Sequence, residues 1–317
     1  MTVHESALDL IGNTPMVDVS ALSPNPRVRI VAKLEGQNPG GSVKDRAAKW
    51  MIDQAEKDGI LTPGSGQVIL ESSSGNTGIA LAMISRVRGY HLKVVLPENV
   101  SVERTQLLLV WGAEIIDSPG TEGSNGAMRR AQAMAAEHDD WWFPFQYGNP
   151  ANPQAHYEST GPEIWRDCPE VTHFVVGLGT AGTVIGVGRY LKEQNAEVEV
   201  WAIEPPSGEM VDGLKNFDDG FVPPVFEDGG GWDLLDRRLV VRPRKSIEWT
   251  RRFTEVGVFA GLSSGAVLAG AAKCAEEIDE GTIVVIVADG GWKYLSTGAW
   301  TDDLDAVEAR AKGIIYF

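Results

Sequence analysis

Residues 38–48 read NPGGSVKDRAA, a loop that runs directly into a helical pattern. The residues at 38–41 are turn formers, and Ser42 is placed to cap the segment that follows. From Val43 onward apolar residues recur about every 3.6 positions, so Lys44 falls in the first turn of an amphipathic helix. A helix N-terminus carries partial positive charge, which disfavours a cation there. Lys44 is therefore either an exposed lysine that tolerates this cost or a desolvated lysine whose lowered pKa lets its amine form a Schiff base.

The composition limits the classes of function. The chain has 317 residues, 43% of them apolar, which is enough for a large core and two lobes. A net charge of −16 argues against nucleic-acid or anionic-membrane partners. Apolar runs are too short to span a membrane, the N-terminal stretch lacks the features of a secretion signal, and the histidines and two cysteines show no metal-ligand spacing. We expect a cytoplasmic, metal-free protein that binds neither nucleic acid nor membranes.

Short β-branched runs alternate with helical patterns along the chain. Strands are expected at 28–34, 67–71, 92–97, 113–117, 173–177, 199–204 and 282–289, and helices at 43–58, 76–88, 102–111, 124–137, 182–193, 246–256 and 264–278. Apolar strands separated by helices predict an α/β fold with parallel sheets covered on both faces, whose ligands bind beyond the carboxyl ends of the strands. The Pro- and Gly-rich region 205–245 is too long for an ordinary connection, so it is either a functional loop or a mobile one.

The strand end at 177–183 reads GLGTAGT. Gly177, Gly179 and Gly182 fit the G-x-G-x-x-G fingerprint of dinucleotide sites, and Glu204 lies where that fingerprint places its acid. The backbone N–H groups and threonine hydroxyls of the same loop suit the compact dianion of a phosphomonoester. A tight turn without a ligand is the third interpretation.

The strand end at 72–82 reads SSSGNTGIALA. Its hydroxyls, amide and backbone N–H groups gather at the start of a helix and suit a small anion such as a carboxylate. The same Ser-Gly-Asn pattern is also that of an elaborate N-cap without a ligand. Residues 261–266, GLSSGA, place two further serines in a turn that opens an apolar helix.

Five motifs together carry a family resemblance: GNTPMV (12–17), NPGGSVKDRA (38–47), SSSGNTGIALA (72–82), GLGTAGT (177–183) and GLSSGA (261–266). Their order and spacing resemble those of the cysteine synthase family, which has the tryptophan-synthase-β-like fold of pyridoxal-phosphate enzymes, and the resemblance covers nearly the whole chain. It implies two lobes, each a mostly parallel sheet flanked by helices. The small, mobile domain would be 38–147 and the large domain 10–37 plus 148–317, with the cofactor between them.

The resemblance also implies roles for single residues. Lys44 matches the lysine that holds the cofactor as a Schiff base and removes the Cα proton of the substrate. Asn76 matches the residue at the cofactor's 3′ oxygen, and Ser263 the one at its pyridine nitrogen. The positions that match the phosphate loop are Gly179, Thr180, Ala181, Gly182 and Thr183, and those that match the substrate-carboxylate site are Ser73, Ser74, Gly75, Thr77 and Gln146.

Within the family, three stretches (149–165, 208–223 and 287–300) resemble the actinobacterial O-phosphoserine-dependent branch more than the O-acetylserine enzymes. That branch has an arginine, suited to the substrate phosphate, where this chain has Lys215. Lysine binds phosphate as a point charge, so Lys215 is either a substrate-binding residue or a solvated loop charge. The resemblance implies a homodimer that makes L-cysteine from O-phospho-L-serine or O-acetyl-L-serine, with sulfide or a thiocarboxylated carrier protein as the sulfur donor.

Two alternatives share the cofactor residues. The first is a related β-replacement or elimination activity, such as cystathionine formation or serine dehydration. The second is a catalytically silent relative that binds pyridoxal phosphate and acts through partner proteins. The presence of Lys44, Asn76 and Ser263 argues against the silent relative.

Overall fold

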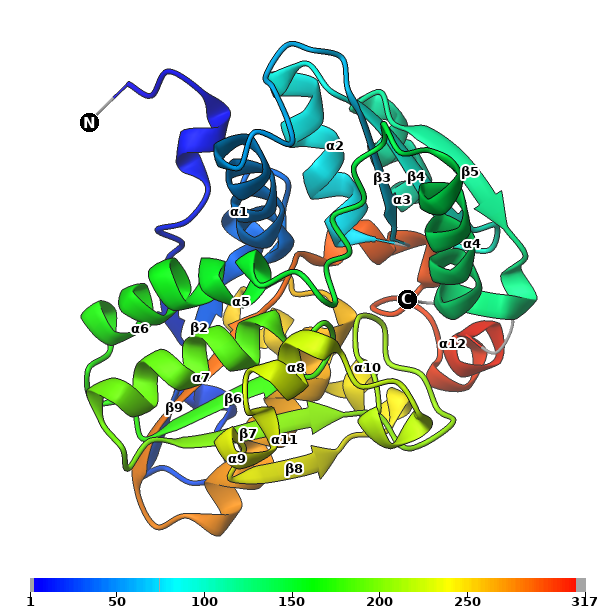
Figure 1. Ribbon diagram of the computed structural model, residues 1–317. Helices are drawn as coiled ribbons and strands as arrows, with labels where there is room; N and C mark the ends of the chain where they lie inside the picture. The colour runs from blue at the N-terminus through cyan, green and yellow to red at the C-terminus, as the bar shows by residue number, and fades with distance from the viewer. Residues whose placement is uncertain (1–2, 74, 312–317) are drawn as a thin grey trace.

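A computed structural model describes residues 3–73 and 75–311, which form two sheets with helices around them (Figure 1). In the six-stranded sheet the order is β1-β2-β9-β6-β7-β8, and in the three-stranded sheet it is β3-β4-β5. The strands are β1 (Met16–Asp18), β2 (Val28–Leu34), β3 (Val68–Ser72), β4 (His91–Pro97), β5 (Glu114–Ser118), β6 (His173–Gly177), β7 (Glu199–Glu204), β8 (Arg237–Val240) and β9 (Gly281–Val287). All neighbouring pairs are parallel except β1 with β2, which is antiparallel.

Helices separate most of these strands. They are α1 (Lys44–Lys57), α2 (Asn76–Arg88), α3 (Val102–Val110), α4 (Gly123–Glu137), α5 (Ala151–Ala155), α6 (Gly161–Asp167), α7 (Gly182–Gln194), α8 (Pro224–Asp228), α9 (Gly231–Leu234), α10 (Pro243–Phe253), α11 (Leu262–Glu277) and α12 (Leu304–Ala311). A π-helical turn, η5 (His156–Thr160), joins α5 to α6. The 3₁₀ turns are η1 (Ala7–Leu10), η2 (Ser20–Leu22), η3 (Glu35–Gln37), η4 (Gly120–Glu122), η6 (Phe217–Asp219), η7 (Thr254–Val256) and η8 (Gly291–Thr297).

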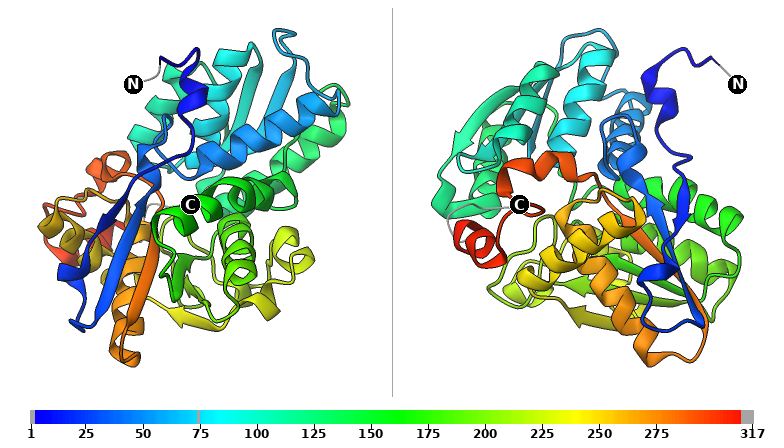
Figure 2. Two further views of the ribbon diagram at one scale, coloured as in Figure 1. Left: turned by 90° about the vertical axis from the view of Figure 1, so that its left-hand side faces the viewer. Right: turned by 180° about the vertical axis from the view of Figure 1, so that it is seen from behind.

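Both faces of each sheet are covered, as the apolar strands predict. On the large sheet, α10 and α11 pack on one face and α6 to α9 on the other. On the small sheet, α1, α2 and α3 pack on one face and α4 on the other. The neighbouring strands β2 and β9 run in register from Val28 opposite Gly281 to Leu34 opposite Val287, and Figure 2 shows these two strands side by side. The loops that follow the carboxyl ends of β2, β3, β6, β7 and β9 lead to one cleft.

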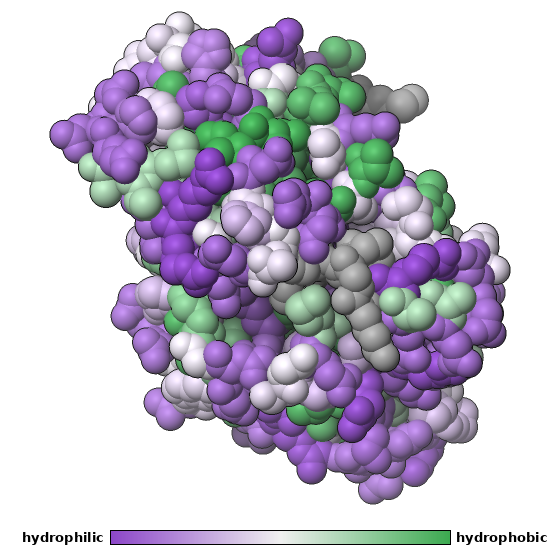
Figure 3. Space-filling view, turned by 90° about the vertical axis from the view of Figure 1, so that its right-hand side faces the viewer, coloured by the Kyte–Doolittle hydropathy of each residue, from purple (hydrophilic) through white to green (hydrophobic). Residues whose placement is uncertain are grey.

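The surface of one side of the molecule is mostly hydrophilic. Hydrophilic residues dominate the face in Figure 3, and apolar residues gather there in smaller groups. No helix within the described ranges is long and apolar enough to cross a membrane. Those ranges also contain no group of three or more His, Cys, Asp or Glu side chains that could hold a metal ion.

Several predictions of local structure need correction. Helix α1 begins at Lys44 with Val43 as its N-cap residue, although the Ser42 hydroxyl does accept a hydrogen bond from the Lys44 N–H at 3.2 Å. The helix expected at 246–256 begins instead at Pro243, a favourable first helical residue, and its last part is the turn η7. Region 205–245 is not one loop, because it contains η6, α8, α9 and the edge strand β8.

The sequence-based domain division remains a prediction. The small sheet and helices α1 to α4 lie inside 38–147, and every strand of the large sheet lies outside it. This distribution agrees with two lobes.

Candidate active site

The loops that follow the strands of both sheets border one open-sided cleft of about 930 Å³. Its place beyond the carboxyl ends of parallel strands is the one expected for a ligand site. The predicted residues that line it are Lys44, Ser73, Gly75, Asn76, Thr77, Gln146, Gly179, Thr180, Lys215 and Ser263. A connected recess adds Ala181 and Thr183. Gly182 lies between these two in the chain, and Ser74 lies outside the described residues.

Lys44 is the first residue of α1 and faces both the cleft and the recess. Burial lowers the pKa of its amine to about 8, and the carboxylates of Asp289 and Glu35 only partly oppose this shift. Among the described residues no hydrogen bond or ion pair reaches Lys44 Nζ. The sequence left open whether this lysine is an exposed charge or a desolvated amine, and its position favours the desolvated amine.

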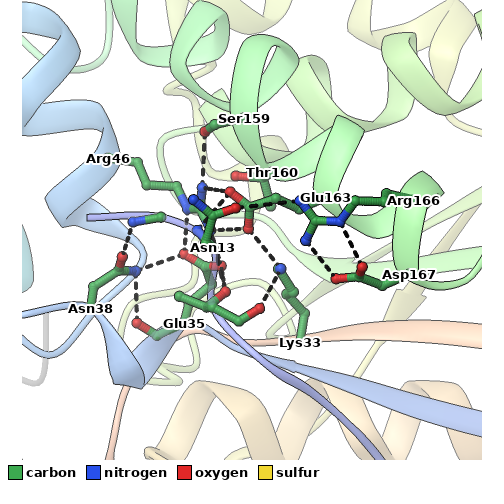
Figure 4. Close-up of polar contacts among 12 residues, drawn as sticks. Asn13, Lys33, Glu35, Asn38, Arg46, Ser159, Thr160, Glu163, Arg166 and Asp167 are labelled. Atoms are coloured by element: carbon green, nitrogen blue, oxygen red, sulfur yellow. Dashed lines mark hydrogen bonds and ion pairs between the residues drawn. The ribbon is translucent and has the colours of Figure 1, made fainter. Parts of the chain in front are cut away.

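Directly behind Lys44, α1 is anchored by a buried ion cluster of Lys33, Glu35, Arg46 and Glu163 (Figure 4). Arg46 lies 2.7 Å from each of the two carboxylates, and Lys33 lies 2.7 Å from Glu163. The side chains of Lys33, Glu35 and Arg46 are fully buried and that of Glu163 is 7% exposed. The cluster joins β2, η3, α1 and α6, so it fixes the helix that carries Lys44.

The loop after β3 forms the small-lobe side of the cleft. The Ser73 hydroxyl accepts hydrogen bonds from the N–H groups of Gly75 (3.3 Å) and Gly78 (3.0 Å), which gives it the capping role that was one interpretation of this motif. The Thr77 hydroxyl donates to the Gln146 side-chain oxygen at 2.6 Å. Two residues 69 positions apart in sequence are thus brought together at the proposed carboxylate site.

Glu71, at the end of β3, was not among the predicted site residues. Its buried carboxyl accepts hydrogen bonds from the N–H groups of Ser72 (2.9 Å) and Gln146 (3.3 Å). Burial raises its pKa to about 8, so the group is mostly protonated at neutral pH. Its side chain connects the two segments that carry the carboxylate-site residues.

The loop after β6 forms the opposite side. Ala181 has a φ of +71°, a left-handed conformation that is uncommon for a residue with a Cβ, and the 13-residue helix α7 follows it at once. Gly179 must lack a side chain, because a Cβ there would lie 2.7 Å from the carbonyl oxygen of Gly213. Backbone N–H groups at such a turn and at a helix N-terminus form an anion-binding concavity.

Glu204, the acid of the dinucleotide fingerprint, forms an ion pair within the fold. The Glu204 carboxylate is 2.7 Å from the Arg238 guanidinium and is only 3% exposed. It also accepts a hydrogen bond from the Phe217 N–H at 3.4 Å. Because Glu204 is bound within the fold, the structure disfavours the dinucleotide interpretation.

At the bottom of the cleft lie Asn76, at the start of α2, and Ser263, in the first turn of α11. The Asn76 side chain is held on both sides: its nitrogen donates to Asp289 at 2.8 Å, and its oxygen accepts from Lys293 at 2.6 Å. Neither Asp289 nor Lys293 was predicted as a site residue, because they lie more than 200 positions from Asn76.

Lys215 lies in the cleft wall rather than on a solvated loop. Its Nζ is 5.4 Å from the ring centre of Tyr147 and 5.7 Å from that of Phe221, and burial lowers its pKa.

An ion pair joins the two sides of the cleft. Arg104 of α3 forms a buried ion pair with Asp212 of the loop after β7, and the Arg104 guanidinium lies 4.9 Å from the ring centre of Tyr294. Arg104 and Asp212 join the two lobes across the cleft, and no sequence motif pointed to them.

Comparison with known proteins identifies the family. The family model described as pyridoxal-phosphate dependent enzyme matches residues 7–289. The chain belongs to this family. It is 42% identical over 296 residues to cysteine synthase B of Salmonella typhimurium, covering 92% of this chain and 95% of that protein.

Solved structures agree over nearly the whole length. The chain superposes on O-ureido-L-serine synthase with a TM-score of 0.87 at 36% identity, covering 97% of this chain and all of the other. The O-acetylserine-dependent cystathionine β-synthase of Helicobacter pylori gives a TM-score of 0.87 at 33% identity, with 95% and 100% coverage. The predicted pyridoxal-phosphate fold, enzyme class and cofactor are therefore confirmed.

Proposed function

We propose that this pyridoxal-phosphate enzyme makes L-cysteine by β-replacement on an activated L-serine, with O-phospho-L-serine as the preferred donor. The observation that carries the proposal is the amine of Lys44, desolvated and without a partner among the described residues, between an anion-binding loop and a hydroxyl-rich loop. The similarity to cysteine synthase B supports the choice of product.

The residues of the cleft fit the cofactor. The turn at 179–183 offers backbone N–H groups in a left-handed conformation at the start of α7, which suits the phosphate group. Asn76 would donate to the ring oxygen, and Ser263 would contact the ring nitrogen. Lys44 lines both the cleft and the recess, where it would hold the cofactor's carbonyl carbon.

When bound, pyridoxal phosphate supplies an electron sink that stabilises negative charge at the substrate Cα. The chain supplies the rest. With a pKa of about 8, a useful fraction of Lys44 is neutral at physiological pH, so its Nζ can take the Cα proton as a general base. Ser73, Gly75, Thr77 and Gln146 would bind the substrate carboxylate, as would Ser74, which lies outside the described residues.

Lys215 supports the choice of donor. The Lys215 cation in the cleft wall would attract the charged phosphate of O-phosphoserine more strongly than the neutral acetyl group of O-acetylserine. Closure of the small lobe over the substrate would exclude water before the leaving group departs. The second candidate function is cystathionine formation, favoured by the similarity to the Helicobacter pylori enzyme.

The donor experiment mixes holoenzyme and sulfide with each serine ester and measures cysteine formed and the change in visible absorption. We expect O-phosphoserine to give the higher kcat/KM and a Lys215→Met variant to lose that advantage while keeping its rate with O-acetylserine. Equal preference for the two donors, or an unchanged preference in Lys215→Met, would contradict the donor assignment. Cystathionine formed from homocysteine faster than cysteine from sulfide would favour the second candidate.

The proposal extends to the setting of the enzyme. We place it in the cytoplasm as a homodimer with a mobile small domain at 38–147, and with sulfide or a thiocarboxylated carrier protein as sulfur donor. Light scattering of the holoenzyme tests the dimer. Turnover with sulfide alone, compared with turnover on a thiocarboxylated protein, decides the sulfur source.

A further inference from the structure

Lys293 is another buried lysine, it contacts Asn76 of the cleft lining, and the proposed reaction gives it no role. It lies in the 3₁₀ turn η8, and the whole residue is 1% exposed. A lysine so deeply buried needs partners for its charge and its hydrogen-bond donors. The question is which groups it holds.

The ammonium of Lys293 has three N–H donors, and three oxygen atoms accept hydrogen bonds from it. It donates to the side-chain oxygen of Asn76 at 2.6 Å and to the carbonyl oxygens of Gly41 at 3.1 Å and Gly40 at 3.3 Å. These acceptors belong to two segments that are distant in sequence: the start of α2 and the loop just before Lys44. One side chain therefore ties together the two segments that approach the cofactor from the small lobe.

The contact also fixes which way the Asn76 amide points. Lysine can only donate, so the amide oxygen must face Lys293, and the nitrogen then faces the carboxylate of Asp289 at 2.8 Å. The same Asp289 oxygen accepts a hydrogen bond from the Tyr294 hydroxyl at 2.5 Å, which holds the carboxylate in place. One N–H of Asn76 is used by Asp289, and the second is left to donate into the cleft that Asn76 lines.

We propose that Lys293 is a positioning residue that orients the Asn76 amide and the loop before Lys44 toward the cofactor. The proposal rests on the proposed function, because it assigns Asn76 and Lys44 to the cofactor. Without Lys293 the amide would be held by Asp289 alone, so it could tilt and turn its second N–H away from the cofactor's ring oxygen. The loop at 38–43 would also lose the donor to its two glycine carbonyls.

The test uses Lys293→Met, which keeps the length of the side chain and removes its charge and donors. The matched control is Lys33→Met, because Lys33 is also fully buried but contacts Glu163 and the Thr14 carbonyl, away from the cleft. Both variants are measured at a temperature at which far-UV circular dichroism shows them folded. The readouts are the dissociation constant for pyridoxal phosphate and the position of its visible band.

We expect Lys293→Met to weaken cofactor binding roughly 10- to 100-fold and to shift the visible band. Lys33→Met should lower the thermal midpoint and change both readouts much less than Lys293→Met does, because Lys33 contacts neither Asn76 nor the loop before Lys44. In an Asn76→Ala background the loss from Lys293→Met should be smaller, because part of its effect passes through Asn76. If Lys293→Met does not fold, Lys293→Gln, whose amide can donate two of the three bonds, is expected to bind the cofactor more weakly than the native protein.

Native affinity and band in the folded Lys293 variant would overturn the inference, as would a loss fully additive with that of Asn76→Ala. Failure of the proposed function looks different. In that case the native protein would form no visible band with pyridoxal phosphate, or a Lys44→Ala variant would form the same band as the native protein.

Discussion

The molecule has two neighbouring regions that bury lysine, and they treat it in opposite ways. In the buried ion cluster Lys33 is 2.7 Å from Glu163 and donates to the Thr14 carbonyl at 2.7 Å, and Arg46 binds two carboxylates. In the cleft, Lys44 Nζ has no such partner among the described residues, and its pKa falls to about 8. A paired buried charge keeps its proton, whereas a desolvated and unpaired amine can release it. The first region holds α1 in place, and the second does the chemistry.

The largest predicted effect comes from a substitution that breaks the buried ion cluster. Replacing Arg46 by Met removes its ion pairs with Glu35 and Glu163 and, among the described residues, leaves only the ion pair of Glu163 with Lys33. It should cost about 3–5 kcal/mol of folding free energy. Urea denaturation of the two proteins measures the difference. The control is Lys49→Met on the same helix, whose partly exposed pair with Asp53 should be worth less than about 1 kcal/mol. Equal losses in both variants would contradict the structural role of the cluster.

Acid should weaken the same cluster. Burial alone would raise the pKa of Glu163, but hydrogen bonds and charge from Arg46 and Lys33 outweigh it and lower the pKa to about 2. A lowered pKa stabilises the fold above the unfolded value of 4.5, and that stability is lost as pH falls from about 4.5 toward about 2. The loss from this group should be roughly 3 kcal/mol.

Denaturation curves at stepped pH test this in native protein and in Glu163→Gln. The variant should be less stable at neutral pH and should show a shallower decline over that acid range. A decline as steep as that of the native protein would show that other carboxylates cause it.

The smallest predicted effect concerns the cleft side. The φ of +71° at Ala181 strains the backbone. Ala181→Gly should therefore stabilise the fold by up to about 1 kcal/mol, because the strain that it relieves exceeds the conformational entropy that glycine adds to the unfolded chain. Ala181→Val should be less stable than the native protein, since a β-branched residue tolerates this conformation least. Thermal unfolding ranks the three, and any order other than Gly, Ala, Val would contradict the strain argument.

Local patterns predicted the regular parts of the fold well. The strands β2, β6 and β7 and the helix α2 have the predicted bounds, because each is a short apolar run or a buried helix between clear turn signals. Strand β8 was missed, since its four residues RRLV begin with two arginines and look polar. Helix α5 was missed because its residues, ANPQA, contain a proline that looks like a loop signal.

In the site, too, local patterns predicted some residues and not others. Residues inside motifs, such as Lys44, Asn76 and Gly179, could be predicted because each motif lies on one loop. Their partners Lys293 and Asp289 could not, since a pairing over more than 200 positions depends on how the two sheets and η8 pack. The same holds for the ion pair of Arg104 with Asp212, 108 positions apart.

The contrast between the paired Lys33 and the desolvated Lys44 is tested most directly by finding which lysine holds the cofactor. The holoenzyme is reduced with borohydride, digested and analysed by mass spectrometry for the lysine that carries the phosphopyridoxyl group. The account predicts the label on Lys44, in the peptide that contains it, and none on Lys33 or Lys293, which are buried and already bound to oxygen acceptors. A label on Lys293, on Lys215 or on no lysine would contradict it.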